Sequence, residues 1–522
     1  MKGRIGGALR IGLIGAVGGM MFTNSALAAQ PDPYASNNQV YPTAKEWSGG
    51  FRASNFDYPT KPLIAQWRPG GPTGRLTPAN AAAYVAAVKK FLAPEMAGLV
   101  NDPQNWSPEK AGWYDMPWGA QGKTLPNGQI NPDSGREALL GSYTGQILQP
   151  DSYPSNPPAI PFQNHAVVYY NDVAGHQLGK IWKDPFKPDL SAAQFPEGSI
   201  VVKAEAVTLD ESQWPVLKGS SVSYIYRPDM ASPKAETDPA KRRPVVTPMR
   251  FLQMAVRIKD KVASPVTGWV FIAFAYDARS GGATVWDRTI PVGATWGNDP
   301  DQANTPDGLA AGGKLQETWV DDGLPQFILD GLGWGGRLSG PLDLGIRHNV
   351  MTVSGKRYGD GNPNVPKSLA SSACVSCHGA AQYPFVANLY PSPNMVFPKE
   401  GEPFLMYDPG TAKWAQWFQN RSGEQALSGD ELVATDYDMM LTFALMNANR
   451  AADTDAFIRR PPAGHRRLGK TSTPIGPIVM MRGALRFVAA IAVLDELGPD
   501  KLWSLAKILS EALGLPLPGV SP

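Results

Sequence analysis

Hydrophobic and polar residues alternate along several segments in the middle of the chain. In the clearest one, 250–258, large hydrophobic residues occupy every second position from Leu252 to Ile258. Because successive side chains of a β-strand point to opposite faces, we expect one face of this strand to be packed and the other partly wet. Four more segments look like strands, so we predict an antiparallel sheet. The alternating residues are Leu252, Met254, Val256 and Ile258 against Gln253, Ala255 and Arg257, and the other segments are 165–170, 199–208, 221–227 and 267–276.

Helical patterns lie on both sides of these strands. One begins at Thr77-Pro78 and runs to Leu92, and another follows the capping-box pattern at 428–431 and runs to Leu445. Two more fall in the C-terminal tail, at 485–497 and 501–513. The expected fold class is α+β, with a mostly antiparallel β-sheet region, then a segment with helices and a helical C-terminal tail.

The amino terminus has the layout of a secretory signal peptide. Lys2, Arg4 and Arg10 precede an apolar stretch at 11–22, and small residues follow as far as Ala28. An uncleaved anchor is the weaker alternative, because the stretch is shorter than the roughly 20 residues of a membrane-spanning helix. We therefore expect residues 1–28 to be removed and the mature chain to be exported to the periplasm.

Composition narrows the choice of partners. Glycine and proline, at 54 and 50 of 522 residues, imply many turns and long loops. Removing the three cations of the signal peptide from a net charge of +2 leaves −1, so no nucleic-acid partner is expected. A second apolar region, 475–494, contains Arg482 and Arg486, so we expect no stable membrane span in the mature chain.

Both cysteines of the chain belong to one motif, Cys374-Val375-Ser376-Cys377-His378, which has the spacing of a c-type haem attachment site. On a helical turn, positions i and i+3 face the same way, so both sulfurs can reach the vinyl groups of one porphyrin. His378 then lies beneath the iron as an axial ligand. Haem attachment outside the cytoplasm agrees with the export signal. We expect one covalently attached haem c, bound by Cys374, Cys377 and His378.

A C-x-x-C pair has three other uses in proteins: a thiol-disulfide redox pair, half of a zinc site and a structural disulfide. A zinc site needs four nitrogen or sulfur ligands, whereas the remaining histidines are scattered along the chain. A redox pair normally follows a buried strand, and 367–372 is not a convincing one. The scattered histidines are His165, His176, His348 and His465.

The sixth iron ligand decides between two kinds of chemistry. A methionine or histidine that occupies the sixth coordination position suits electron transfer, whereas an open position permits small-molecule binding or catalysis. Any single methionine is more often core filler than ligand. The sequence leaves the choice open among none, His348, Met395, Met406, Met439, Met440, Met446, Met480 and Met481.

Four stretches carry a family resemblance: "VVYYNDVAGHQLGKIW", "FPEGSIVVKAEAV", "GWVFIAFAYD" and "ACVSCHGAAQYPFVANLYP". In this order they resemble the cytochrome P460 and cytochrome c′-beta group, over roughly 166–391. The resemblance implies an antiparallel sheet, a c-type haem and a proximal histidine, often with the other iron face open. In P460 members a strand lysine is joined to the haem, and the matching residue here is Lys203. The alternative is a strand lysine that faces water.

The chain departs from that group in two places. A tryptophan- and glycine-rich insertion, 277–373, separates the third stretch from the haem motif, and its aromatic loops either pack on the sheet or cover the haem. The residues after His378 are Gly379-Ala380-Ala381-Gln382, without the acidic residue of the short P460 enzymes.

These patterns predict a function for the chain and a division into five regions. The leading function is electron transfer to a redox partner protein. The alternatives are an open haem site that oxidises a small nitrogen compound or binds a diatomic gas, and a non-catalytic module of a periplasmic assembly. A basic stretch at 459–470 either docks an acidic partner or is a solvated loop. The regions are 1–28 (signal peptide), 29–150 (loop-rich and helical), 151–373 (β-rich, with the 277–373 insertion), 374–450 (haem segment) and 451–522 (helical tail).

Overall fold

The computed structural model divides into a unit that ends at Ile458 and a second unit that begins at Arg459. Several predictions fall outside the described residues: the signal peptide, His348, Met480, Met481, the basic stretch 459–470 and the helices of the tail. The structure describes residues 31–61, 73–125, 127–300, 314–343, 345, 349–359, 364, 368–395 and 402–458.

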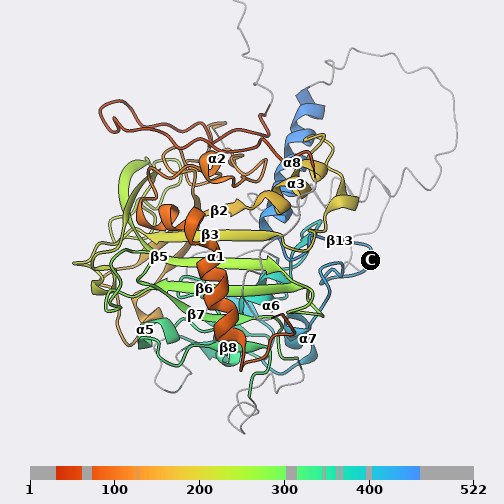
Figure 1. Ribbon diagram of the computed structural model, residues 1–522. Coiled ribbons are helices and arrows are strands. Elements are labelled where there is room, and N and C mark those ends of the chain that lie inside the picture. The colour runs from red at the N-terminus through yellow and green to blue at the C-terminus, as the bar shows by residue number, and fades with distance from the viewer. Residues whose placement is uncertain are drawn as a thin grey trace, which may run out of the picture. The chain divides into compact units, whose positions relative to one another are not determined.

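An eight-stranded antiparallel sheet forms the centre of the first unit (Figure 1). Its order is β1-β2-β3-β5-β6-β7-β8, and β4 pairs with one end of the long strand β5. The sheet confirms the α+β class and all five predicted strand segments. Its members are β1 (Tyr143–Leu148), β2 (Phe162–Tyr170), β3 (Ile200–Val207), β4 (Val222–Arg227), β5 (Val245–Lys259), β6 (Trp269–Tyr276), β7 (Thr289–Thr295) and β8 (Thr318–Val320).

One face of this sheet carries the main hydrophobic core. Helix α1 (Ala81–Asn101) crosses the strands on this face (Figure 1), and it is longer than the predicted helix. Its buried side chains pack with the hydrophobic set of β5, as the alternation predicted. Trp286 and Trp296 of the insertion are buried in the same core, so these tryptophans pack on the sheet.

The opposite face is covered as well, which differs from the expectation of a partly wet face. Gln253 and Arg257 of β5 are buried, and only Ala255 between them stays partly exposed. Helices α3 (Asp172–Ile181), α6 (Cys374–His378) and α8 (Met439–Ile458) contribute to a second hydrophobic cluster with aromatic residues of β2 and β6. The haem motif therefore packs on the sheet face that α1 does not cover.

Smaller elements complete the unit. A three-stranded sheet and a two-stranded sheet lie outside the large sheet, and the three-stranded one packs in a third hydrophobic cluster with Trp414 and Trp417. The elements are β9 (Val350–Thr352), β10 (Arg357–Tyr358), β11 (Gln382–Tyr383), β12 (Phe404–Met406), β13 (Val433–Ala434), α2 (Pro108–Ala111), α5 (Gln326–Leu329), α7 (Ala412–Ala415), η1 (Pro150–Ser152), η2 (Leu190–Ala192), η3 (Pro215–Leu217), η4 (Trp334–Gly336) and η5 (Gln416–Phe418).

The helix predicted after Ser428 starts later than the capping-box pattern indicated. Ser428 does not cap a helix; its hydroxyl and its N–H bond to the side chain of Gln382. Asp436 and Tyr437 then have positive φ angles of 50° and 62°, which a right-handed helix does not allow. The helix, α8, begins only at Met439, and the Asp438 carboxylate caps it by accepting the N–H of Leu441 (2.9 Å).

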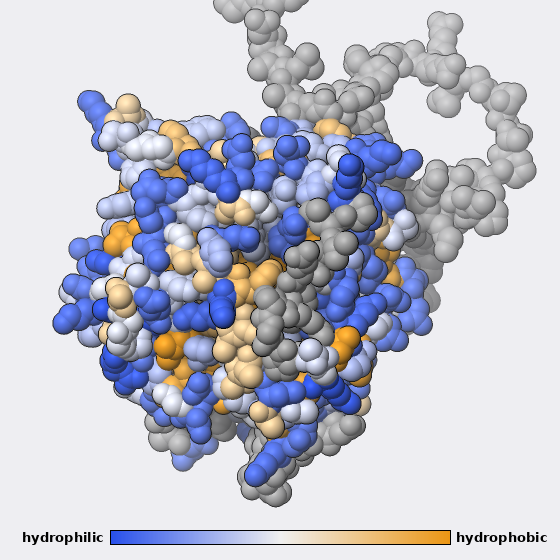
Figure 2. All heavy atoms as spheres, in the orientation of Figure 1, coloured by the Kyte–Doolittle hydropathy of each residue, from blue (hydrophilic) through white to orange (hydrophobic). Residues whose placement is uncertain are grey.

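Hydrophilic residues predominate on the side of the surface drawn in Figure 2, and a band of hydrophobic residues runs down its middle. Exposed apolar side chains such as Val245, Val262 and Val386 come from separate parts of the chain. Among the described residues, no helix combines the length and the hydropathy needed to cross a bilayer.

Candidate haem-attachment site

Helix α6 is a single turn that presents Cys374, Cys377 and His378. The Ser376 hydroxyl closes the start of the turn by accepting the N–H of Ala373 (2.7 Å). Val375 and Ser376 are buried, whereas the two cysteines and the histidine are all partly exposed. The three motif residues are therefore more accessible than the two residues between them, as attachment of a group to this turn requires.

Both cysteines are free thiols. Burial, with the carboxylate of Asp343 adding to it, raises the pKa of Cys377 to about 12 and that of Cys374 above its usual range. The structure therefore holds two neutral thiols at a spacing of one helical turn. It contains no structural disulfide between them.

The ring of His378 has a fixed orientation. Its Nδ1 lies 2.8 Å from the backbone carbonyl oxygen of Tyr437, and its ring centroid lies 5.1 Å from that of Phe271 on β6. Since a carbonyl can only accept, Nδ1 carries the proton and Nε2 is the nitrogen with a lone pair. Burial, and secondarily the charge of Arg257, lowers the pKa of this imidazole to about 3, so the ring is neutral.

The Tyr437 carbonyl is held in place by charged groups of the sheet. Arg257 of β5 donates hydrogen bonds both to this carbonyl and to the carboxylate of Asp438. On the other side, Asp436 accepts from Lys259 Nζ (2.5 Å) and from the indole N–H of Trp269 (2.8 Å). These contacts fix the backbone of 436–438, including its two positive φ angles, against the sheet.

Lys203 lies on the same sheet face as the haem motif and is ion-paired. Its Nζ lies 2.6 Å from Asp343 and 2.8 Å from Glu205, and about a third of its side chain is exposed. Burial alone would lower the pKa of Lys203, but the two carboxylates outweigh it and raise the pKa above its usual range. Gln253 completes the cluster by donating to Glu205 (2.8 Å) and to Asp343 (2.5 Å).

The residues beside Lys203 form a partly exposed row across the sheet. Val168 pairs with Lys203, which pairs in turn with Ala255. All three are partly exposed, while the remaining residues of β2 and β3 are buried. The charges of Lys203 and Asp343 shift the pKa of Cys377, so this row and the haem motif are electrostatic neighbours.

The sequence motif predicts Cys374, Cys377 and His378 as site residues but does not predict most of the groups around them. The structure brings Cys374, Cys377 and His378 together on one turn and places Lys203 near them. It adds groups that no motif signals: Phe271, Arg257, Asp343, Tyr437 and Asp438. Of these groups, the sequence predicted only the position of Arg257, because the alternation along β5 places it on the face opposite the hydrophobic residues.

The candidate sixth ligands lie in different surroundings. Met406 is fully buried in the third hydrophobic cluster, and Met395 is 44% exposed. Met439, Met440 and Met446 lie on α8, and Met440 packs against the second cluster, which Cys374 also contacts. Met440 is thus the candidate whose packing is shared with the haem motif.

Nothing in the described part of the chain supports a zinc site. No group of three or more histidine, cysteine, aspartate or glutamate residues there has an arrangement that could hold a metal. His165 is buried on β2, and His176 on α3 uses Nδ1 in a contact with the carbonyl of Pro59 (2.7 Å).

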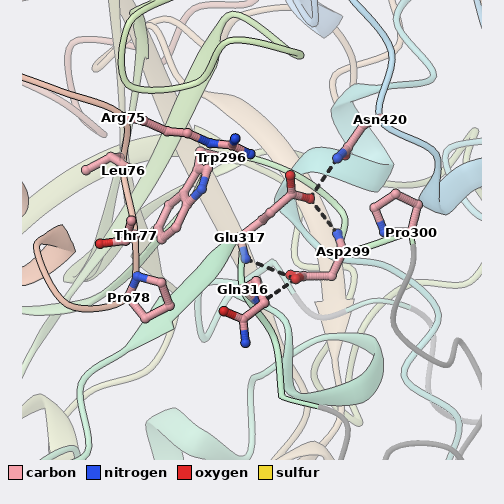
Figure 3. A pocket seen from close by; sticks show the side chains of 10 residues that line it. All are labelled: Arg75, Leu76, Thr77, Pro78, Trp296, Asp299, Pro300, Gln316, Glu317 and Asn420. Atoms are coloured by element: carbon pink, nitrogen blue, oxygen red, sulfur yellow. Dashed lines mark hydrogen bonds between the residues drawn. The ribbon is translucent and has the colours of Figure 1, made fainter.

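A pocket of about 400 Å³ with a mixed polar and apolar lining is built from other residues (Figure 3). The Glu317 carboxylate accepts the N–H of Asp299 (2.9 Å) and the side-chain amide of Asn420 (2.7 Å). The Asp299 carboxylate accepts the N–H of Glu317 (3.0 Å). Because none of the haem-motif residues lines it, we do not assign this pocket to the haem. It is lined by Arg75, Leu76, Thr77, Pro78, Trp296, Asp299, Pro300, Gln316, Glu317 and Asn420.

Comparison with models of known protein families, with curated proteins and with solved structures finds no match for this chain.

Proposed function

We propose that this chain is a mono-haem c-type cytochrome that transfers electrons in the periplasm. The observation that carries the proposal is the geometry of His378, whose Nδ1 lies 2.8 Å from the Tyr437 carbonyl oxygen. Iron-ligating histidines in proteins characteristically donate their second ring nitrogen to a carbonyl or carboxylate, which fixes the ring and leaves the other nitrogen for the metal. The same helical turn offers two free thiols.

The donor set fits haem c better than the other groups considered. Cys374 and Cys377 would hold the porphyrin through two thioethers, and His378 Nε2 would bind the iron. A bound haem would supply one-electron redox chemistry. The residues around it would fix the ring of His378, through Tyr437, and pack an apolar ring against it, through Phe271.

A second candidate is a haem protein with one open iron face. The partly exposed row of Val168, Lys203 and Ala255 favours it, because the charge of Lys203 is close enough to the motif to act on the pKa of Cys377. Such a protein would oxidise a small nitrogen compound or bind a diatomic gas, as the resemblance to the cytochrome P460 and c′-beta group implies. Lys203 would then be the residue joined to the haem or facing its open side.

One optical experiment separates the two candidates. The protein is purified from a host with a c-type maturation system, and its oxidised and reduced spectra are recorded with and without CO. A methionine sulfur-to-iron charge-transfer band and no spectral response to CO support the electron-transfer proposal. Absence of that band together with ready CO binding supports the open site. The matched variant Met440→Leu would remove the band if Met440 is the sixth ligand.

A further inference from the structure

Two donors share the carbonyl oxygen of Tyr437. One is Nδ1 of His378 and the other is a guanidinium nitrogen of Arg257. Arg257 belongs to the sheet, whereas Tyr437 belongs to the segment that leads into α8. The carbonyl therefore links the candidate iron ligand to a fixed positive charge.

Arg257 has little freedom to leave this position. Its side chain is 7% exposed, and its second guanidinium nitrogen is paired with the fully buried Asp438. The ring centroid of Trp269 lies 5.3 Å from the guanidinium carbon. Asp438 is itself fixed, because it accepts the hydroxyl of Tyr170 (3.1 Å) and caps α8.

The charged guanidinium of Arg257 weakens the hydrogen bond that the Tyr437 carbonyl can accept from His378. An oxygen that already accepts from a guanidinium is a weaker acceptor for the imidazole N–H. A weaker bond at Nδ1 leaves less negative charge on the ring, and a ring with less negative charge donates fewer electrons to a metal at Nε2. An electron-poor ligand favours the reduced iron, which raises the reduction potential.

On this basis, and resting on the haem function proposed above, we propose that Arg257 is a positioning residue that sets the reduction potential of the haem through the Tyr437 carbonyl. Asp438 opposes it by drawing the guanidinium toward its own carboxylate. Arg257 and Asp438 together adjust the electron donation of the axial ligand His378 without contacting the haem.

The test uses the holoprotein with variants of opposite expected sign. Arg257→Gln removes the charged donor and is expected to shift the potential downward. Arg257→Lys keeps the charge but not the two-pronged geometry, and is expected to shift the potential in the same direction. Asp438→Asn keeps an oxygen for the α8 cap and frees the guanidinium for the carbonyl, so an upward shift is expected.

Arg242→Gln is the matched control, because it removes a largely buried cation that pairs with Asp133 (3.0 Å), and neither residue belongs to the 436–438 segment. The iron–histidine vibration, or the nitrogen NMR shift of His378 in the reduced protein, is measured with each potential. The inference holds if both signals move in the Arg257 variants and the His378 signal stays unchanged in the control.

It is overturned if Arg257→Lys keeps the wild-type potential, or if the Arg257 and Asp438 variants shift the potential in the same direction. Haem content and circular dichroism identify any variant that fails to fold, and the remaining variants of opposite sign still decide the outcome. A wild-type protein without haem would instead refute the proposed function itself.

Discussion

Nζ of Lys203 lies 2.6 Å from the carboxylate of Asp343, which follows it by 140 residues in the sequence. The contact ties β3 to the segment between η4 and β9, and Lys203 also pairs with the buried Glu205 (2.8 Å). Lys203→Met would leave the Glu205 carboxylate buried without a cation. Because Lys203 is about one-third exposed, we expect a loss of about 2 kcal/mol of stability, less than for a fully buried pair.

Urea unfolding of Lys203→Met and of the double variant Lys203→Met/Glu205→Gln measures this loss. The double variant removes the unpaired charge together with its partner and is expected to recover most of the stability. Equal destabilisation of the two variants would contradict the ion-pair account.

Peptide mapping of the holoprotein tests the role of Lys203 in cofactor binding. In the electron-transfer proposal Lys203 stays charged and ion-paired, so its peptide is expected to have its native mass. Haem would be found only on the peptide that contains Cys374 and Cys377. A haem mass on the Lys203 peptide would favour the P460-like alternative.

His165 is expected to make the fold sensitive to acid. Its ring is buried, neither ring nitrogen has a hydrogen-bond partner, and burial lowers its pKa to about 3. Above about pH 6.5 the ring is neutral in both states. Between pH 6.5 and 3 the unfolded chain binds a proton that the folded chain does not, so stability falls as the pH falls through this range.

The loss of stability can be calculated from the pKa shift of His165. At about 1.4 kcal/mol per pKa unit, the upper limit is roughly 5 kcal/mol across the range. His165→Leu breaks no hydrogen bond and removes the titrating group. We expect its free energy of unfolding to depend less on pH than that of the wild type between pH 6.5 and 4. Parallel curves for the two proteins would contradict this assignment.

Gly333 is expected to tolerate no side chain, because its backbone packs against the residues just before the haem motif. A Cβ atom there would lie 2.1 Å from the carbonyl oxygen of Ser372. Gly333→Ala must displace the backbone at Ser372, at a cost of about 1–3 kcal/mol. Gly281→Ala is the control, since nothing lies within 4 Å of its added Cβ. Thermal unfolding and haem content of the two variants measure the difference, and equal values would refute the packing argument.

The sequence predicted the strands whose local alternation is clear, but the equally local capping-box pattern at Ser428 did not mark the start of α8. Alternation predicted the central part of β5 and the side on which its hydrophobic residues lie. It missed β7, where Pro291 and Gly293 interrupt the run of strand formers, and β8, which has only three residues. Pairing with neighbouring strands, and not local preference, holds these two segments in the sheet.

The sequence likewise predicts some parts of the candidate site and not others. Cys374, Cys377 and His378 could be predicted from the sequence because the proposed haem attachment would require them at fixed spacing in one turn. The partner of His378 is a backbone carbonyl, and a carbonyl has no signature in a sequence. Its position depends on positive φ angles at Asp436 and Tyr437 and on buried charges from two strand residues far along the chain, Arg257 and Lys259. These contacts appear only once the sheet is formed.

The most direct test of the central claim is the intact mass and colour of the protein purified from the periplasm of a host with c-type maturation. We expect a red protein whose mass equals the mature chain plus one haem, and haem that stays attached on a denaturing gel. The double variant Cys374→Ala/Cys377→Ala should lose the covalently bound haem. A colourless wild-type protein with the mass of the polypeptide alone would contradict the account.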